Sequence, residues 1–319
     1  MSRLDPVALD CLIAVVDEGG FQGAARRLGI SQSAVSQRVK ALEQSVGSLL
    51  VVRTRPVSLT DAGRTIVRYG RRLGAMHDDL SRELGQSSGS GRIRIALNAD
   101  SLATWALDAL DPLVRDGVDL EIVVDDESRT IDRLRHGDVL GCVAARAEPV
   151  LGATVRWLGA IRYQSVASPA FADRFLPHGL RARDLATTPF LVFGPHDPLQ
   201  HNWVERAFRV RDPILRQRFV PSSDAYVRAC VLGWGVAVIP LLQSRDHLAA
   251  GRLVVVHDRT IDVDLHWHAW PSGMNGEMAP AGAHRARSER SAAPVDLLGR
   301  IGDVLENAAK ATLYRHTRR

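Results

Sequence analysis

One segment near the N-terminus carries side chains that suit contact with a nucleic acid. It offers amides, hydroxyls and cations close together: Gln32, Ser33, Ser36, Gln37, Arg38 and Lys40. Amides pair well with adenine, hydroxyls adapt to several base edges, and cations neutralise phosphates. No acidic side chain occurs in this stretch before Glu43, as insertion into a negatively charged groove requires. The residue types therefore predict a helix that reads the major groove of DNA.

Three helical segments are expected to position these side chains. Apolar residues recur at helical spacing over residues 9–16, 21–28 and 35–46. Gly29 lies in the short turn before the third segment, and Ser31 is a suitable N-cap for it. A short helix joined to a longer one through a glycine-containing turn is typical of a helix-turn-helix. A small helical bundle with a solvated polar face has the same periodicity, so periodicity alone leaves both interpretations open.

A short hairpin follows the third segment and favours the DNA-binding interpretation. Residues 50–52 and 57–59 have the pattern of two strands, and the turn between them contains Arg53 and Arg55. Such a β-wing would place both arginines near DNA phosphates. A wing together with a helix-turn-helix is more specific than either feature alone. We therefore expect an all-α winged helix-turn-helix domain over residues 1–60.

The next segment predicts a long helix with a coiled-coil seam. Thr60 is a suitable N-cap for a helix over residues 61–84. Its apolar residues follow alternating steps of four and three: Ala62, Ile66, Tyr69, Leu73, Met76 and Leu80. The seam could pack on its own domain, but we favour pairing with a second chain, which would present two recognition helices to DNA. Small polar residues at 85–91 predict a hinge, so residues 61–91 form the dimerisation segment.

The N-terminal motifs together resemble those of LysR-type transcriptional regulators. The resemblance covers Phe21–Lys40, residues 41–54 and Leu59–Gly63, with Leu50 where these regulators more often have Phe. It implies that Gln32, Ser33, Ser36 and Gln37 contact bases and that Arg38, Lys40 and Arg53 contact phosphates. It also implies a homodimer formed through the linker helix and a homotetramer of such dimers. The expected partner is double-stranded promoter DNA, and RNA polymerase is kept as a further candidate.

From Arg92 onward, strand-like and helix-like segments alternate. The β-α-β-α-β order over residues 92–145 predicts an α/β fold with a parallel sheet. Further strand-like runs recur at 162–167, 190–193, 216–220, 236–239 and 253–256, and so many units fit two lobes better than one. The family resemblance implies a two-lobed effector domain, like periplasmic binding proteins, over residues 92–319. Lobe I would contain about 92–163 and 268–319, and lobe II about 164–267.

Polar side chains follow several of these strands, where ligands bind in α/β sheets. The candidate effector contacts are Asn98, Asp100, Ser101, Asp125, Asp126, Glu127, Asp197, Ser222 and Ser223. Serines at helix N-termini can hold a carboxylate, and the acidic run at 125–127 would attract an ammonium or guanidinium group. Together these features describe a basic amino acid. Each residue alone is equally explained as a helix cap or a solvated loop residue.

Four runs after residue 92 resemble the regulators of lysine and arginine export, the LysG/ArgP branch of the LysR group. They are Leu97–Trp105, Gly137–Gly141, Phe193–Gln200 and Pro221–Pro240. This resemblance implies activation of an exporter gene when intracellular L-lysine or L-arginine is high. Residues 273–293 depart from the branch and have the composition of an inserted loop. A LysR-type regulator of another operon with a different small-molecule effector stays open.

Other function classes have less support in the sequence. A nucleophile elbow, a phosphate-binding glycine loop and a metal-spaced cluster are all missing, so we expect no enzyme, metal or cofactor. His266 and His268 share one face of a strand, and Cys11, Cys142 and Cys230 lie too far apart for a disulfide framework. With neither a signal peptide nor a membrane-length apolar run, we expect a cytoplasmic protein. These features and the helix-turn-helix disfavour a plain amino-acid-binding protein.

Overall fold

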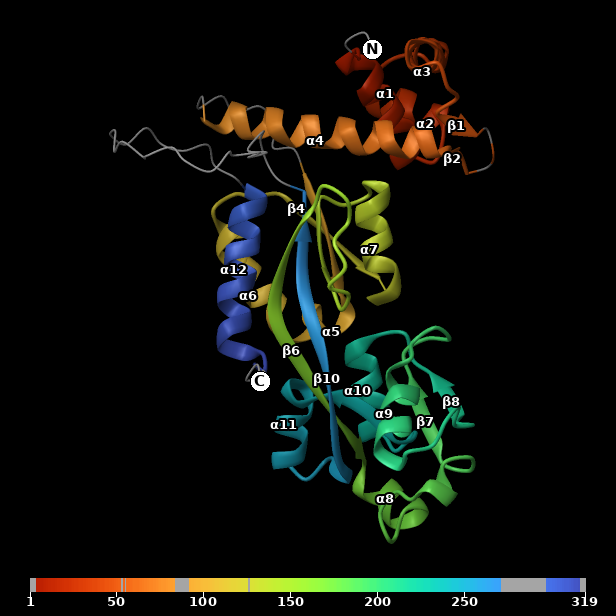
Figure 1. Cartoon of the computed structure of the whole chain (residues 1–319), viewed down its shortest axis with the longest axis vertical. Helices are drawn as coiled ribbons and strands as arrows, with labels where there is room; N and C mark the ends of the chain where they lie inside the picture. The colour runs from red at the N-terminus through yellow and green to blue at the C-terminus, as the bar shows by residue number, and fades with distance from the viewer. Residues whose placement is uncertain are drawn as a thin grey trace, which may run out of the picture.

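The computed structural model describes residues 4–52, 54, 56–83, 92–125, 127–270 and 297–315. Its N-terminal domain is a three-helix unit with a two-stranded wing (Figure 1). The elements are α1 (Pro6–Asp17), α2 (Phe21–Leu28), α3 (Gln32–Val46), β1 (Val51–Val52) and β2 (Ser58–Leu59). Gly29 adopts a left-handed φ of 65° between α2 and α3, and the Ser31 hydroxyl accepts a hydrogen bond from the Ala34 amide at 3.1 Å. The predicted winged helix-turn-helix is confirmed.

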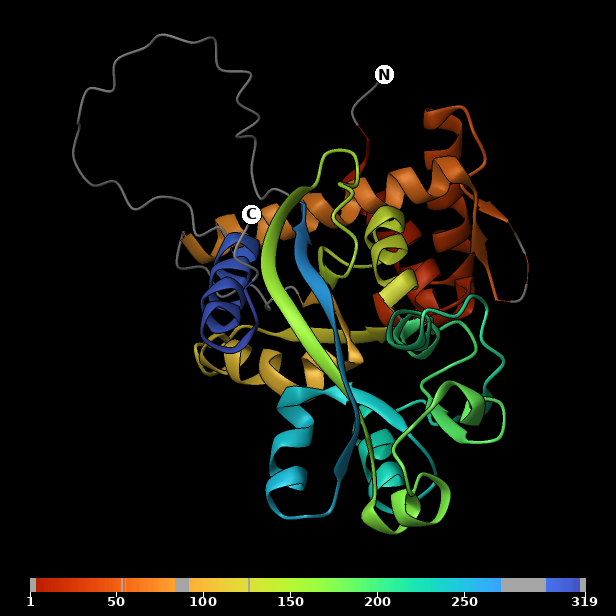
Figure 2. The ribbon, with the colours of Figure 1, turned by 60° about the horizontal axis from the view of Figure 1, so that its bottom comes forward.

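Helix α4 (Asp61–Glu83) leaves this domain and lies across one end of the effector domain (Figures 1 and 2). The Thr60 hydroxyl caps it by accepting from the Gly63 amide at 3.0 Å. Ile66 is buried in the N-terminal core, whereas Tyr69, Leu73 and Met76 are exposed in the single chain. The first part of the predicted seam therefore packs on its own domain, and the second part stays available for a partner. The predicted hinge at 85–91 lies outside the described residues.

The effector domain is organised around one mixed sheet. Its strand order is β4-β3-β5-β10-β6-β9, and a separate parallel pair, β7-β8, lies in the second lobe. The strands are β3 (Ile93–Asn98), β4 (Leu120–Asp125), β5 (Gly141–Ala144), β6 (Thr154–Ala167), β7 (Pro189–Val192), β8 (Arg216–Phe219), β9 (Ala237–Pro240) and β10 (Val254–Ala269). β3 pairs in parallel with β4 and β5, and β6 and β10 are long antiparallel partners. The two-lobed α/β architecture predicted from the sequence is confirmed.

Helices cover both lobes (Figure 1). Lobe I has α5 (Ala99–Ser101), a π-helical turn η1 (Leu102–Ala106), α6 (Leu107–Arg115), α7 (Glu127–His136) and α12 (Leu297–Thr312). Lobe II has α8 (Pro169–Phe175), the 3₁₀ turn η2 (Ala182–Asp184), α9 (Leu199–Phe208), α10 (Ser223–Val231) and α11 (Leu241–Ala249). The predicted insertion at 273–293 lies outside the residues described above.

Two strands join the lobes. β10 pairs with lobe I strand β5 over His266–Ala269, and β6 pairs with lobe II strand β9 over Tyr163–Val166. Trp267 is fully buried opposite Val143 in lobe I, so the return crossing lies a few residues before the boundary predicted at 267. The boundary is hard to read from sequence because β10 continues as one strand through both lobes.

The described residues contain no cluster of three or more His, Cys, Asp or Glu side chains that could hold a metal ion. His266 and His268 are largely buried on one face of β10, and the Nε2 atom of His268 lies 2.7 Å from the Arg146 carbonyl oxygen. All three cysteines are buried free thiols. None of the helices within the described ranges is both long and apolar enough to span a bilayer.

The exposed stripe on α4 generates a prediction about assembly. Leu73→Asp places a charge in the proposed seam and should raise the dimer dissociation constant about tenfold or more, since a buried Leu contributes about 1.5–3 kcal/mol. Sedimentation velocity over a concentration series measures this constant. The control is Leu151→Asp, because Leu151 is 97% exposed in a loop. Equal sedimentation of Leu73→Asp and wild type would contradict a dimer formed through this stripe.

Candidate functional site

The outer face of α3 gathers most of the side chains predicted to contact DNA. Gln32, Ser33, Gln37 and Lys40 are exposed, and Ser36 is half-buried among them. The opposite face of α3 buries Val35, Val39 and Leu42 in the domain core. α3 lies at the outer end of the molecule in Figure 1, away from the effector domain. This arrangement can enter a major groove, where amides and hydroxyls meet base edges.

Arg38 does not lie with the other polar side chains of α3. It is half-buried on the flank that faces α1, and its Nη1 atom is 3.9 Å from the Cys11 sulfur. The helical turn places it away from Gln32 and Ser36, so a phosphate contact by Arg38 would have to be made from the edge of the domain. Arg53 and Arg55 of the wing lie outside the described residues, and their phosphate contacts stay predictions.

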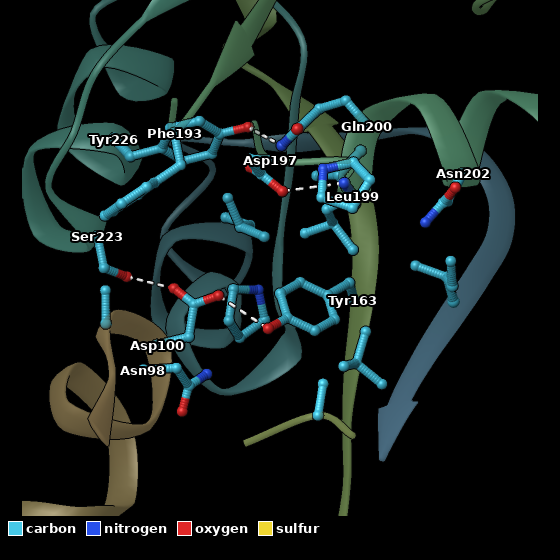
Figure 3. Close-up of a pocket in the computed structure, with 18 of the residues that line it drawn as sticks. Asn98, Asp100, Tyr163, Phe193, Asp197, Leu199, Gln200, Asn202, Ser223 and Tyr226 are labelled. Atoms are coloured by element: carbon cyan, nitrogen blue, oxygen red, sulfur yellow. Dashed lines mark hydrogen bonds between the residues drawn. The ribbon is translucent and has the colours of Figure 1, made fainter. Parts of the chain in front are cut away.

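A second candidate site is a cavity of about 380 Å³ between the two lobes (Figure 3). Its wall contains Asn98 and Asp100 from lobe I, Gln200 and Ser223 from lobe II, and Tyr163 from the crossover strand β6. The cavity thus lies beyond the carboxyl end of β3 and at the N-terminal end of α10, where α/β sheets bind ligands. Its volume is in the range of small-molecule sites.

The Asp100 carboxyl group connects three parts of this wall. Its Oδ1 atom accepts a hydrogen bond from the Ser223 hydroxyl at 2.6 Å, and its Oδ2 atom accepts one from the Tyr163 hydroxyl at 2.8 Å. Burial raises the pKa of Asp100 above its ordinary value of 3.8, and these two hydrogen bonds only partly offset the rise. Within the described part of the chain, no cationic side chain pairs with Asp100. A cationic ligand group would supply the missing partner.

Gln200 adds another buried acceptor to the cavity. Its Nε2 atom donates to the Tyr226 hydroxyl at 2.8 Å, and Tyr226 in turn donates to the Leu191 carbonyl at 2.7 Å. This fixed chain leaves the Gln200 Oε1 atom buried without a partner among the described residues. Burial and the nearby Asp197 raise the pKa of Tyr226, so its hydroxyl stays a donor. The cavity is therefore rich in acceptors that suit N–H groups.

Features that favour an anion lie on the same cavity. Ser223 is the first residue of α10, whose N-terminus Ser222 caps by accepting from the Ala225 amide at 3.4 Å. A helix N-terminus carries partial positive charge and free amides. Arg146 and Arg206 also contribute to the cavity wall. The cavity can accommodate a zwitterion that bears an additional positive group.

The cavity brings together four of the nine predicted effector residues: Asn98, Asp100, Asp197 and Ser223. Ser101 is fully buried next to Asp100, and Ser222 serves as the α10 cap. Asp125 ends β4 and Glu127 begins α7, while Asp126 lies outside the described residues. An effector contact by residues 125–127 stays a prediction.

Several cavity residues were not anticipated from the sequence. Tyr163, Gln200, Tyr226 and Gln243 all lie in the wall. Gln200 and Tyr226 fall within runs that resemble the export regulators, but their residue types alone indicate no ligand contact. Tyr163 lies in an apolar strand, so its sequence context does not indicate a ligand contact. Its hydroxyl meets Asp100 only because β6 crosses between the lobes.

The helix after Asp100 has an irregular turn at the cavity. The π-helical residues Leu102–Ala106 lie between α5 and α6, and the Thr104 hydroxyl donates to the Asp100 carbonyl at 2.6 Å. Such π-turns cost regular hydrogen bonding and occur frequently at functional sites. The irregular turn therefore supports a functional role for this end of the helix.

Both halves of the chain match known family models. Residues 7–64 match the bacterial regulatory helix-turn-helix protein, lysR family, and residues 86–276 match the LysR substrate binding domain. The regulator ArgP of Pseudomonas fluorescens (strain Pf0-1) is 42% identical over 270 residues, which span 83% of this chain and 90% of ArgP. The lysine export transcriptional regulatory protein LysG of Corynebacterium glutamicum is 37% identical over 270 residues, or 84% of this chain and 92% of LysG.

A solved structure has the same architecture. Full-length LysG from Corynebacterium glutamicum with bound effector Arg has a TM-score of 0.71 at 34% identity, covering 97% of this chain and 99% of that one. These similar proteins are transcription regulators and not enzymes, in agreement with the absence of catalytic motifs noted in the sequence.

The predicted base contacts of α3 can be tested by removing one amide. Gln32→Ala should weaken binding to an operator selected from random DNA by about 1–3 kcal/mol and relax its base preference. Binding to random-sequence DNA should stay unchanged, because the amide contacts bases and not phosphates. Lys40→Ala is the matched control and should weaken both complexes and reduce the salt slope by about one. Fluorescence anisotropy over a salt series measures both. An equal loss on both DNAs by Gln32→Ala would contradict a base-reading role.

The raised pKa of Asp100 predicts a pH-dependent stability. A carboxyl group whose folded-state pKa is raised contributes stability below its unfolded pKa, 3.8, and loses that contribution as pH rises through the folded-state value. Ligand-free Asp100→Asn, which keeps the shape but cannot ionise, should therefore unfold at a higher temperature than wild type at neutral pH. The difference should shrink as pH approaches 3.8. Calorimetry over a pH series measures it, with exposed Asp173→Asn as control. A pH-independent difference would refute the prediction.

Proposed function

The chain belongs to the LysR family of bacterial transcription regulators, and we propose that it controls an exporter gene for basic amino acids in response to lysine or arginine. Two findings on LysG support this proposal, since LysG is called a lysine export regulator and its solved structure holds arginine. We further propose that the effector binds between the lobes, in the cavity around Asp100.

The observation that supports a cationic effector most strongly is the buried carboxyl of Asp100. An acid held in a cavity without a cation is costly, and pairing it with a positive group recovers charge-assisted hydrogen bonds worth about 1.5–3 kcal/mol each. The unpartnered Gln200 Oε1 atom is a second acceptor for the same ligand. A guanidinium or ammonium group has enough N–H donors to satisfy both residues. The ligand carboxylate would then face the N-terminus of α10.

Effector binding at this position would act on the arrangement of the lobes. Asp100 belongs to lobe I, Ser223 to lobe II and Tyr163 to the strand that joins them. A ligand that binds both lobes stabilises the closed arrangement in proportion to its differential affinity for that state. In a dimer or tetramer on DNA, this shift would change the spacing of the recognition helices and the bend of the promoter. RNA polymerase would respond to that change.

The same proposal assigns a location. Promoter DNA and free intracellular amino acids share one compartment in bacteria, so we place the protein in the cytoplasm. The outward face of α3 provides the contact with DNA, and the cavity provides the contact with the metabolite.

Ligand charge provides the test of the proposed function. Calorimetry of the full-length protein should show binding of L-arginine and L-lysine, and citrulline should bind more weakly by about 3 kcal/mol, because it leaves the acceptors without a cation. Asp100→Asn should lose the preference for arginine over citrulline, whereas exposed Asp173→Asn should keep it. Equal binding of citrulline and arginine by wild type would rule out the proposed effector class.

A further inference from the structure

Three arginines on one face of α4 contact the effector domain. Arg68, Arg71 and Arg72 follow one another at helical spacing, so their side chains leave the same face. The guanidinium carbons of Arg68 and Arg72 lie 5.4 and 5.2 Å from the ring centre of Trp270, which follows β10 and is 3% exposed. Guanidinium groups at this distance from an indole ring are attracted to its electron-rich face.

The same face of α4 also contacts the turn between α7 and β5. Arg68 Nη1 donates to the Arg135 carbonyl at 3.0 Å, and Arg71 Nη1 donates to the Gly137 carbonyl and lies 3.3 Å from Asp138 Oδ1. Gly137 has a φ of 72°, and a Cβ atom there would lie 2.6 Å from the Arg68 Cα. The turn and the helix backbone are thus in direct contact, and only glycine allows this approach.

Arg71 extends the contact to the DNA-binding domain. Its Nη2 atom lies 2.6 Å from Oδ1 of Asp17, at the end of α1, and both side chains are only 13% exposed. One guanidinium therefore joins an acid of the DNA-binding domain to an acid of the effector domain. Arginine can do this because its planar fork presents donors in two directions, whereas lysine has one compact charge.

The contact is also connected to the interlobe cavity. β10 contributes Ile261 and Asp262 to the cavity wall and leads directly to Trp270. On the neighbouring strand, β5 leads to the cavity residue Arg146, whose carbonyl bonds to buried His268 of β10. A movement of the cavity wall would therefore be passed along two hydrogen-bonded strands to the residues that hold α4.

We propose that Arg68, Arg71 and Arg72, together with Trp270, Gly137 and Asp138, form an arginine clamp that sets the orientation of the DNA-binding domain. Through the clamp, a change in the arrangement of the cavity wall alters the orientation of α3 in the same chain. Arg71 is its positioning residue, because it alone of the three arginines also pairs with Asp17 in the described structure. The effector part of this inference rests on the proposed function.

Arg71→Ala tests the clamp in the full-length protein. Arginine binding measured by calorimetry and affinity for random DNA should equal those of wild type, because neither site is touched. Hydrogen exchange should become faster at residues 132–138, and the arginine-induced change in operator affinity should fall about two- to thirtyfold. Arg71→Lys should be intermediate. Arg64→Ala is the matched control, since Arg64 lies on the same helix but bonds to Leu59 and Asp61 of its own domain.

Asp138→Asn provides a second variant in case Arg71→Ala folds poorly. It removes one acceptor of the clamp and leaves the pair between Arg71 and Asp17 in place. Unchanged exchange at residues 132–138 in a folded variant, or an unchanged operator response to arginine, overturns the clamp. If wild type binds no basic amino acid in the calorimeter, the proposed effector is wrong. In that case the clamp is tested without the effector, by comparing hydrogen-exchange rates and operator footprints of Arg71→Ala and Arg64→Ala. Identical results for the two variants overturn the clamp.

Discussion

β6 and β10 pair with each other from Ala167 and Val254 at one end to Thr154 and Ala269 at the other. Because this ladder runs through both lobes, its register determines which residues of each lobe face the cavity. Irregularities in the register occur near Gln164 and between Leu265 and His266, where the strands pass between lobes. The ladder therefore fixes the order of the cavity residues on both strands, and its irregular positions lie near the passage between the lobes.

The cavity contains two buried polar groups whose burial is only partly compensated within the described chain. Asp100 is buried, and burial raises its pKa, while the Gln200 carbonyl oxygen has no partner in the described structure. Such groups lower the stability of the empty protein, since buried polar atoms lose their bonds to water. The proposed basic amino acid would satisfy them, so part of its binding free energy would come from removing that deficit. The proposed effector site would in this way couple stability and effector binding through the same residues.

The linker helix makes three contacts from two faces, because Ile66 and Leu73 share the apolar stripe and Arg71 lies on the other side of the helix. Ile66 packs in the core of the DNA-binding domain, Leu73 and its neighbours are exposed for a partner chain, and Arg71 points to the effector domain. One rigid helix therefore relates the DNA-binding domain, the proposed dimer contact and the effector domain. α1, α3 and α4 pack in one hydrophobic core. A change in the contacts between the effector domain and α4 would therefore change the orientation of α3.

Local patterns in the sequence determined the element types, the domain order and the exposed polar face of α3, because helical periodicity, caps and glycine turns involve residues close together in the chain. Those patterns could not distinguish Asp100 from the other acids after strands, and they grouped Arg38 with residues from which it is turned away. The hydrogen bonds from Tyr163 and Ser223 to Asp100, and the pairing of Arg71 with Asp17 and Asp138, were decided only by the tertiary structure. Burial and the close approach of distant segments decide which of several identical acidic or basic side chains makes a given contact. Neither can be deduced from the spacing of neighbouring residues.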